Sequence, residues 1–196
     1  MKLTLTSTLI ASALTLAAFS SAAQAQGRLV VYCSATNEMC ETETKAFGDK
    51  YDVKTSFIRN GSGSTLAKVD AEKKNPQADV WYGGTLDPQS QAGEMGLLQP
   101  YKSPNLEQIM EKFRDPAKVK GNLSSAVYVG ILGFGVNTQR LKEKNLPVPK
   151  CWKDLTKPEY KGEIQIADLQ SSGTAYTALA TFAQLWGEDQ AFDYLK

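Results

Sequence analysis

The sequence has 196 residues, of which 42% are hydrophobic and 22% charged, and its formal net charge is +1. This is the composition of a globular protein, and it excludes a disordered or fibrous chain. The chain has no polybasic block, which argues against nucleic acid or an anionic membrane as a partner, and it has no histidine, which excludes Ser-His-Asp and Cys-His catalysis and histidine-ligated zinc.

The first 25 residues have the pattern of a secretory signal peptide. Lys2 gives a positively charged start, Leu9–Phe19 is a short apolar run, and Ala23-Gln24-Ala25 is a small-x-small cleavage site. The run is too short to cross a bilayer, and a buried N-terminal helix is the less favoured alternative. We therefore expect cleavage between Ala25 and Gln26, export to the periplasm, and a remaining chain of net charge zero.

Apolar runs alternate with segments of helical spacing along residues 29–94. We expect strands at 29–32, 53–58 and 78–82, and helices at 38–50, 64–74 and 87–94. Strands that alternate with helices of this length predict βαβ units and a parallel sheet, because parallel strands are covered on both faces. The predicted fold class is therefore α/β.

The second part of the chain is less regular. We expect an irregular connection at 97–104, a helix at 105–113, an extended apolar segment at 126–136 and a turn-rich link at 145–149. A helix is predicted from Ser171 to about Trp186, and another from Glu188 that reaches Lys196 without a stop signal.

Four short polar loops lie at the predicted starts of helices, where backbone N–H groups lack helical partners and attract anions. They are Ser34-Ala35-Thr36-Asn37, Asn60 to Thr65, Gly83-Gly84-Thr85, and Ser171-Ser172-Gly173-Thr174. Each has a purely structural alternative: a hydroxyl or amide that caps the helix, with Ser64 as the expected cap of the second helix, or a tight turn after the third strand.

The three cysteines belong to a chain that is expected to enter an oxidising compartment. Cys33 and Cys40 flank the first loop, so we expect a short disulfide between them and no partner for Cys151 within these residues. A Cys-x6-Cys metal site is less favoured, because no further ligands accompany the pair.

Five motifs, taken together and in order, resemble the iron-type branch of periplasmic solute-binding proteins, the capture components of ABC importers. They are LVVYCSATN, NGSGSTLAKVDAEKKNPQADVWYGGT, GILGFGVNTQRL, PKCWKDLTKPEYKGEIQIADLQSSGTAYT and FDYLK, and the similarity is greatest to members that bind hexose phosphates. The resemblance implies a two-lobed type II fold, with a first lobe at 26–128 and the beginning of a second at 129–196. Because chains of this family are longer, it also implies that the rest of the second lobe is absent here.

The resemblance places the polar loops in the cleft between the lobes. It implies that the ligand is bound by Ser34, Thr36, Asn37, Ser62, Ser64, Thr65, Gly84, Thr85, Ser172, Gly173 and Thr174. In the resembling iron proteins, a Ser-Gly-x segment that corresponds to Ser172-Gly173-Thr174 holds a phosphate.

The ligand expected from these features is a small anionic solute, most of all a phosphorylated sugar. Ferric iron is the main alternative, and a phosphonate or a thiamine-like molecule are others. Iron-binding members carry a histidine and a glutamate where this chain has Thr36 and Gly84, which disfavours iron. We expect no cofactor and no bound metal, a monomer, no nucleic-acid partner, and an ABC permease of the inner membrane as the protein partner.

A periplasmic hydrolase is the distant alternative, with Ser62 or Ser64 as nucleophile and Lys68 as base. The Ser-x-x-Lys spacing is absent, since Ser64 lies four residues before Lys68 and only Thr65 lies three before it. No nucleophile has an evident base, so we expect a binding protein and not an enzyme.

Overall fold

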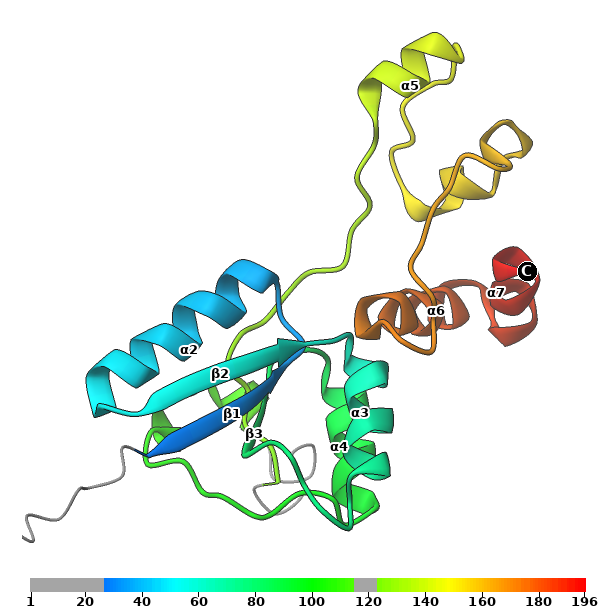
Figure 1. The fold of residues 1–196 in the computed structure, drawn as a ribbon. Coiled ribbons are helices and arrows are strands. Elements are labelled where there is room, and N and C mark those ends of the chain that lie inside the picture. Colours follow the sequence, from blue (N-terminus) through cyan, green and yellow to red (C-terminus); the bar gives the residue numbers. More distant parts are fainter. Residues whose placement is uncertain (1–26, 115–122) are drawn as a thin grey trace, which may run out of the picture.

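The structure is a computed structural model that describes residues 27–114 and 123–196. The expected signal peptide and its cleavage site lie outside the described residues. An N-terminal unit, residues 27–114, is joined by an extended segment, residues 123–136, to a C-terminal unit, residues 137–196 (Figure 1).

The N-terminal unit is built on a parallel three-stranded sheet of order β2-β1-β3, as the alternating pattern predicts. The strands are β1 (Arg28–Cys33), β2 (Lys54–Arg59) and β3 (Val80–Tyr82). The central strand β1 becomes fully buried in its second half, where its neighbours cover both edges. The α/β fold class expected from the sequence is confirmed.

Three helices cover this sheet: α2 (Asn37–Tyr51) on one side, and α3 (Ser62–Ala71) and α4 (Leu86–Glu94) together on the other (Figure 1). Helix α3 begins two residues earlier than expected, so Ser64 is not its cap. The carbonyl of Gly61 accepts hydrogen bonds from both the N–H and the hydroxyl of Thr65, at 2.9 and 3.0 Å. These two hydrogen bonds fix the first turn of the helix at Ser62.

The prediction of a helix at 105–113 is wrong. The structure has two short 3₁₀ turns, η1 (Leu106–Gln108) and η2 (Glu111–Phe113), separated by extended backbone at Ile109 and Met110. Neither turn buries a residue, and a helix this short needs tertiary packing to offset the cost of its nucleation.

The connecting segment is extended, as expected, and leads to α5 (Thr138–Glu143), the 3₁₀ helices η3 (Trp152–Thr156) and η4 (Pro158–Tyr160), and the helices α6 (Gly173–Trp186) and α7 (Glu188–Leu195). Glu163 ties α5 to the chain after η4, because its carboxylate pairs with Arg140 at 2.8 Å and with Lys144. The helices predicted near 171–186 and from 188 onward are both present.

The core of the C-terminal unit is an aromatic cluster. Phe182 is 3% exposed; its ring stacks on Trp186, with centroids 4.7 Å apart, and meets Trp152 and Tyr194 edge to face. Edge-to-face and offset stacks of this kind add to the free energy gained by burial alone. The cluster therefore holds α6, α7 and η3 together.

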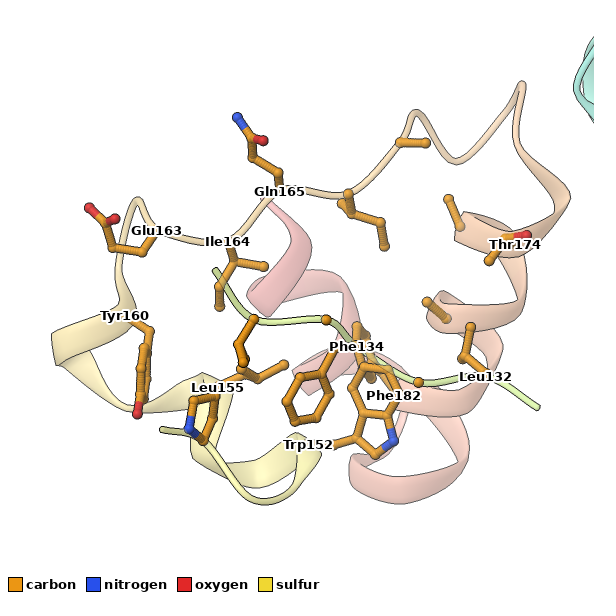
Figure 2. Close-up of a pocket in the computed structure, with 18 of the residues that line it drawn as sticks. Leu132, Phe134, Trp152, Leu155, Tyr160, Glu163, Ile164, Gln165, Thr174 and Phe182 are labelled. Carbon is orange, nitrogen blue, oxygen red and sulfur yellow. The ribbon is translucent and has the colours of Figure 1, made fainter. Parts of the chain in front are cut away.

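An apolar cavity of about 350 Å³ adjoins this cluster. Figure 2 shows Ile164 on one side of the cavity and Phe134, Trp152 and Phe182 gathered on the other. Among the described residues, the two extended segments that line it, 132–136 and 164–167, make no backbone hydrogen bonds. Ser172 and Thr174, at the start of α6, also belong to its lining.

Candidate functional site

The carboxyl ends of the three parallel strands lie at one edge of the sheet, and the polar loops of the N-terminal unit meet there. Ser34 follows β1, and its hydroxyl lies 3.0 Å from that of Thr65 in α3. The indole N–H of Trp81 in β3 donates to the Ser34 hydroxyl at 3.0 Å. Because the only hydroxyl proton of Thr65 goes to the carbonyl of Gly61, Ser34 is the donor to Thr65.

A second contact joins the starts of α3 and α4. The backbone N–H of Thr85 donates to the buried hydroxyl of Ser62 at 3.2 Å. Gly84 packs so tightly that a Cβ built on it would lie 2.4 Å from the Ser62 hydroxyl and 2.8 Å from the Cβ of Ser34. Five of the predicted residues, Ser34, Ser62, Thr65, Gly84 and Thr85, are thus brought together at this edge.

The first loop is held from both ends. Cys33, the last residue of β1, forms a disulfide with Cys40 in the first turns of α2, and their Cα atoms are 5.9 Å apart. Arg59 of β2 donates from Nε to the carbonyl of Ala35 at 3.0 Å. Within the loop, the Thr36 hydroxyl accepts from the N–H of Met39 at 3.3 Å and caps α2.

Thr36 and Asn37 are both exposed, and they are not drawn into the contacts between Ser34, Ser62 and Thr85. The local alternative of a helix cap therefore describes Thr36 in this structure. Cys151 is a free and exposed cysteine.

The start of α6 carries backbone donors that are still available. The hydroxyl of Ser172 accepts from the N–H of Ala175 at 3.3 Å and caps the helix. No hydrogen bond is found for the N–H groups of Gly173 and Thr174 within the described residues. Two free N–H groups and the positive end of a 14-residue helix form an arrangement that binds a phosphate or carboxylate.

The start of α6 contacts the N-terminal unit through Gly173, which is buried. A Cβ on Gly173 would lie 2.3 Å from Oγ1 of Thr85 and 2.6 Å from the hydroxyl of Ser62. That Oγ1 atom is buried and has no hydrogen-bond partner among the described residues. The predicted residues from both units therefore converge at Gly173.

Two contributing residues were missed as site residues from the sequence. The hydroxyl of Tyr128, in the connecting segment, accepts from the N–H of Gly84 at 2.7 Å, and the indole N–H of Trp81, in β3, donates to Ser34. Neither has a local signal, since an aromatic residue in an apolar run predicts burial.

Lys68, the base required by the hydrolase alternative, is engaged elsewhere. Its Nζ pairs with Glu72 at 2.8 Å, and this bond raises the pKa of Lys68 above its usual value. The hydroxyl of the buried Tyr32 donates to the same carboxylate at 2.6 Å, and burial, together with that carboxylate, raises the pKa of Tyr32. A lysine that is held more firmly in its protonated form is a poor general base.

Within residues 27–114 and 123–196, no group of three or more His, Cys, Asp and Glu side chains is placed to hold a metal ion. In the same residues, no helix combines the length and the apolar character that crossing a membrane requires.

Polar loops at a sheet edge, facing a helix start with free N–H groups, are an arrangement that can hold a small anionic solute. Residues 75–196 match the sequence profile of the bacterial extracellular solute-binding proteins, and the chain belongs to this family. It is a family of binding proteins without catalytic activity, so the expectation of no enzyme agrees with it and the hydrolase alternative is not supported.

Three proteins illustrate the similarity. An uncharacterized protein of Haemophilus influenzae is 71% identical over 180 residues, which are 91% of this chain and 52% of that protein. The structure of the periplasmic binding protein AfuA from Actinobacillus pleuropneumoniae, with exogenous fructose-6-phosphate bound, is 77% identical with a TM-score of 0.82 over 87% of this chain and 54% of that one. A probable ABC transporter periplasmic-binding protein of Sinorhizobium fredii is 28% identical over 71% of this chain and 38% of that protein.

The chain thus spans about half the length of the relatives it matches. The resemblance to the iron-type branch with hexose-phosphate-binding members, and with it the type II fold, is confirmed. AfuA is a periplasmic binding protein whose structure holds a sugar phosphate, and the Sinorhizobium fredii protein is a probable periplasmic binding protein.

Proposed function

We propose that this chain is part of the periplasmic binding component of an ABC importer, and that its ligand is a hexose phosphate such as fructose 6-phosphate. The observation that carries the proposal is the 77% identity to a protein whose structure contains fructose 6-phosphate. In this proposal residues 1–25 are a cleaved signal peptide, residues 26–128 form the first lobe, and 129–196 begin the second. The partner is a permease of the inner membrane, and the binding protein is a monomer.

The start of α6 supports a role as the phosphate site. Its two free N–H groups belong to Gly173 and Thr174, and the unpartnered hydroxyl of Thr85 lies against Gly173. Small residues allow a phosphate oxygen to come close to the backbone, and the helix dipole favours its charge. Residues of the N-terminal unit then surround the sugar: Ser34, Thr36, Asn37, Ser64 and Gly84 line it, and the buried Ser62 and Thr65 support them from behind.

The test is a chimera in which this chain replaces the matching first part of AfuA from Actinobacillus pleuropneumoniae, because about half of the fold of the relatives lies outside these residues. Isothermal titration calorimetry with fructose 6-phosphate should show one site. Thr174→Asp should lower the affinity at least tenfold, because it puts a carboxylate beside the free N–H groups. Asp is tolerated at a helix start, so the melting temperature should stay close to that of the parent.

The matched control is Thr138→Asp, which makes the same change at the exposed first residue of α5. It should leave affinity unchanged. If Thr174→Asp and Thr138→Asp bind equally well, the phosphate site is wrong. If the chimera binds ferric ion tightly and fructose 6-phosphate not at all, the ligand class is wrong and the ferric alternative replaces it.

A further inference from the structure

We infer that Gly61 and Gly63 are positioning residues, which dock the C-terminal unit onto the N-terminus of α3 through the backbone carbonyl of Ser171. The N–H of Gly63 donates to this carbonyl at 3.1 Å, and the N–H of Ser64 lies 3.5 Å from it. The first turn of α3 is therefore capped by a carbonyl from a segment more than a hundred residues away in the sequence.

The two glycines are needed for space and not for backbone conformation. Gly61 has φ −66° and ψ 160°, and Gly63 is an ordinary helical residue, so any residue type adopts these angles. A Cβ on Gly61 would lie 2.2 Å from the Ser171 oxygen, and one on Gly63 would lie 1.7 Å from the Gln170 oxygen. Both clashes involve backbone atoms, which cannot rotate away.

Glycine within a helix is costly without such a reason. Alanine at an interior helical position is about 1 kcal/mol more favourable than glycine. Gly63 is the second residue of α3, so the gain from alanine there is smaller than in the helix interior but has the same sign. The close approach of the C-terminal unit is thus the physical explanation for glycine at this position.

The carbonyl is presented by a turn that Asp168 organises. The carboxylate of Asp168 accepts from the N–H groups of Ser171 at 2.9 Å and Gln170 at 3.1 Å. The N–H of Ser172 donates to the backbone carbonyl of Asp168 at 3.0 Å. The bonds to the carboxylate, that from the Ser171 backbone first among them, lower the pKa of Asp168 below its usual value. The turn is therefore held by hydrogen bonds of its own, separate from its contact with α3.

Docking also decides which helix start is open to a ligand. The Ser171 carbonyl occupies the amides of α3, whereas the N–H groups of Gly173 and Thr174 in α6 stay free. The contact joins backbone atoms of the two units directly and its test measures the distance between them, so its failure is distinguishable from failure of the proposed function.

The test uses the chain itself, with one spin label on the native exposed thiol of Cys151 and a second on Lys74→Cys, an exposed position just beyond α3. Double electron–electron resonance should give a single narrow distance distribution. Gly63→Ala should replace it with a broad, longer one and raise the exchange rate of the Ser64 amide about tenfold, because that amide loses its carbonyl partner.

The control is Gly130→Ala, which adds the same methyl group where nothing lies within 4 Å. It should keep the narrow distribution. Exchange of the later amides of α3 should slow in Gly63→Ala, since alanine favours the helix; general unfolding would instead speed their exchange. A narrow distribution retained in Gly63→Ala, or equal broadening in Gly130→Ala, would overturn the inference.

Discussion

The disulfide between Cys33 and Cys40 should stabilise the N-terminal unit by an amount that its loop length sets. The two cysteines are seven positions apart, so the bond closes a loop of eight residues that contains Ser34 to Asn37. In the chain-entropy description, a loop of this size contributes about 2.5 kcal/mol by restricting the unfolded chain. Replacing both cysteines with alanine should therefore raise the unfolding equilibrium constant of this unit roughly 60-fold.

Amide hydrogen exchange of β1 measures this directly, because β1 is the central strand and its amides exchange only when the unit opens. The exchange rates of Val31 and Tyr32 should rise by about that factor in the double variant, and a reducing agent should produce the same rise in the parent but no further rise in the variant. Cys151→Ala is the control, since this cysteine is exposed and free, and it should change stability by less than about 0.5 kcal/mol. Equal β1 exchange in the double variant and in Cys151→Ala would refute the reasoning.

Three further predictions follow from single contacts. A hydrogen bond from Lys157, with others from the backbone, lowers the pKa of Asp154 to about 2 from a usual value of 3.8. The stabilising contribution of the Asp154 carboxylate is therefore present above pH 3.8 and is lost as the pH falls toward 2. In urea denaturation, Asp154→Asn should remove this part of the loss of stability in acid. Phe182→Ala should cost about 3 kcal/mol in chemical denaturation followed by tryptophan fluorescence, because a nearly fully buried ring is lost from the aromatic cluster. Trp81→Phe should destabilise the N-terminal unit by about 1 kcal/mol, read from exchange of β1 amides, because the Ser34 hydroxyl loses its donor; no change would show that this hydrogen bond contributes nothing.

The local parts of the fold could be predicted from the sequence, because strand and helix periodicity is a short-range signal. The parallel sheet and the helices α2, α4, α6 and α7 have boundaries close to the expected ones. The segment 105–113 failed because its pattern allows a helix that no packing supports. Helix α3 begins earlier than expected because the Gly61 carbonyl pairs with Thr65, whereas glycine in the stretch Asn60-Gly61-Ser62-Gly63 predicts a turn.

The polar loops were predicted as site residues from their place at helix starts, and most of them do gather at one edge of the sheet. What the sequence could not decide is which of their hydrogen-bonding groups cap helices and which stay free. Thr36 and Ser172 cap helices, and the amides of Gly63 and Ser64 face the Ser171 carbonyl. The two caps are local contacts, three residues apart, whereas the pairing with the Ser171 carbonyl depends on the approach of a segment far away in the chain, which no spacing within one motif encodes.

The hydroxyl chain at the end of β1 has a direction, and the direction has a chemical consequence. Protons point from Trp81 to Ser34, from Ser34 to Thr65, and from Thr65 to the Gly61 carbonyl. Ser34 therefore has no proton left to donate, only a lone pair. A neighbouring group that carries its own O–H or N–H is attracted there, and one that presents only negative oxygens is repelled. Ser34 and the start of α6 thus have opposite hydrogen-bonding character, with a lone pair at one and free N–H donors at the other.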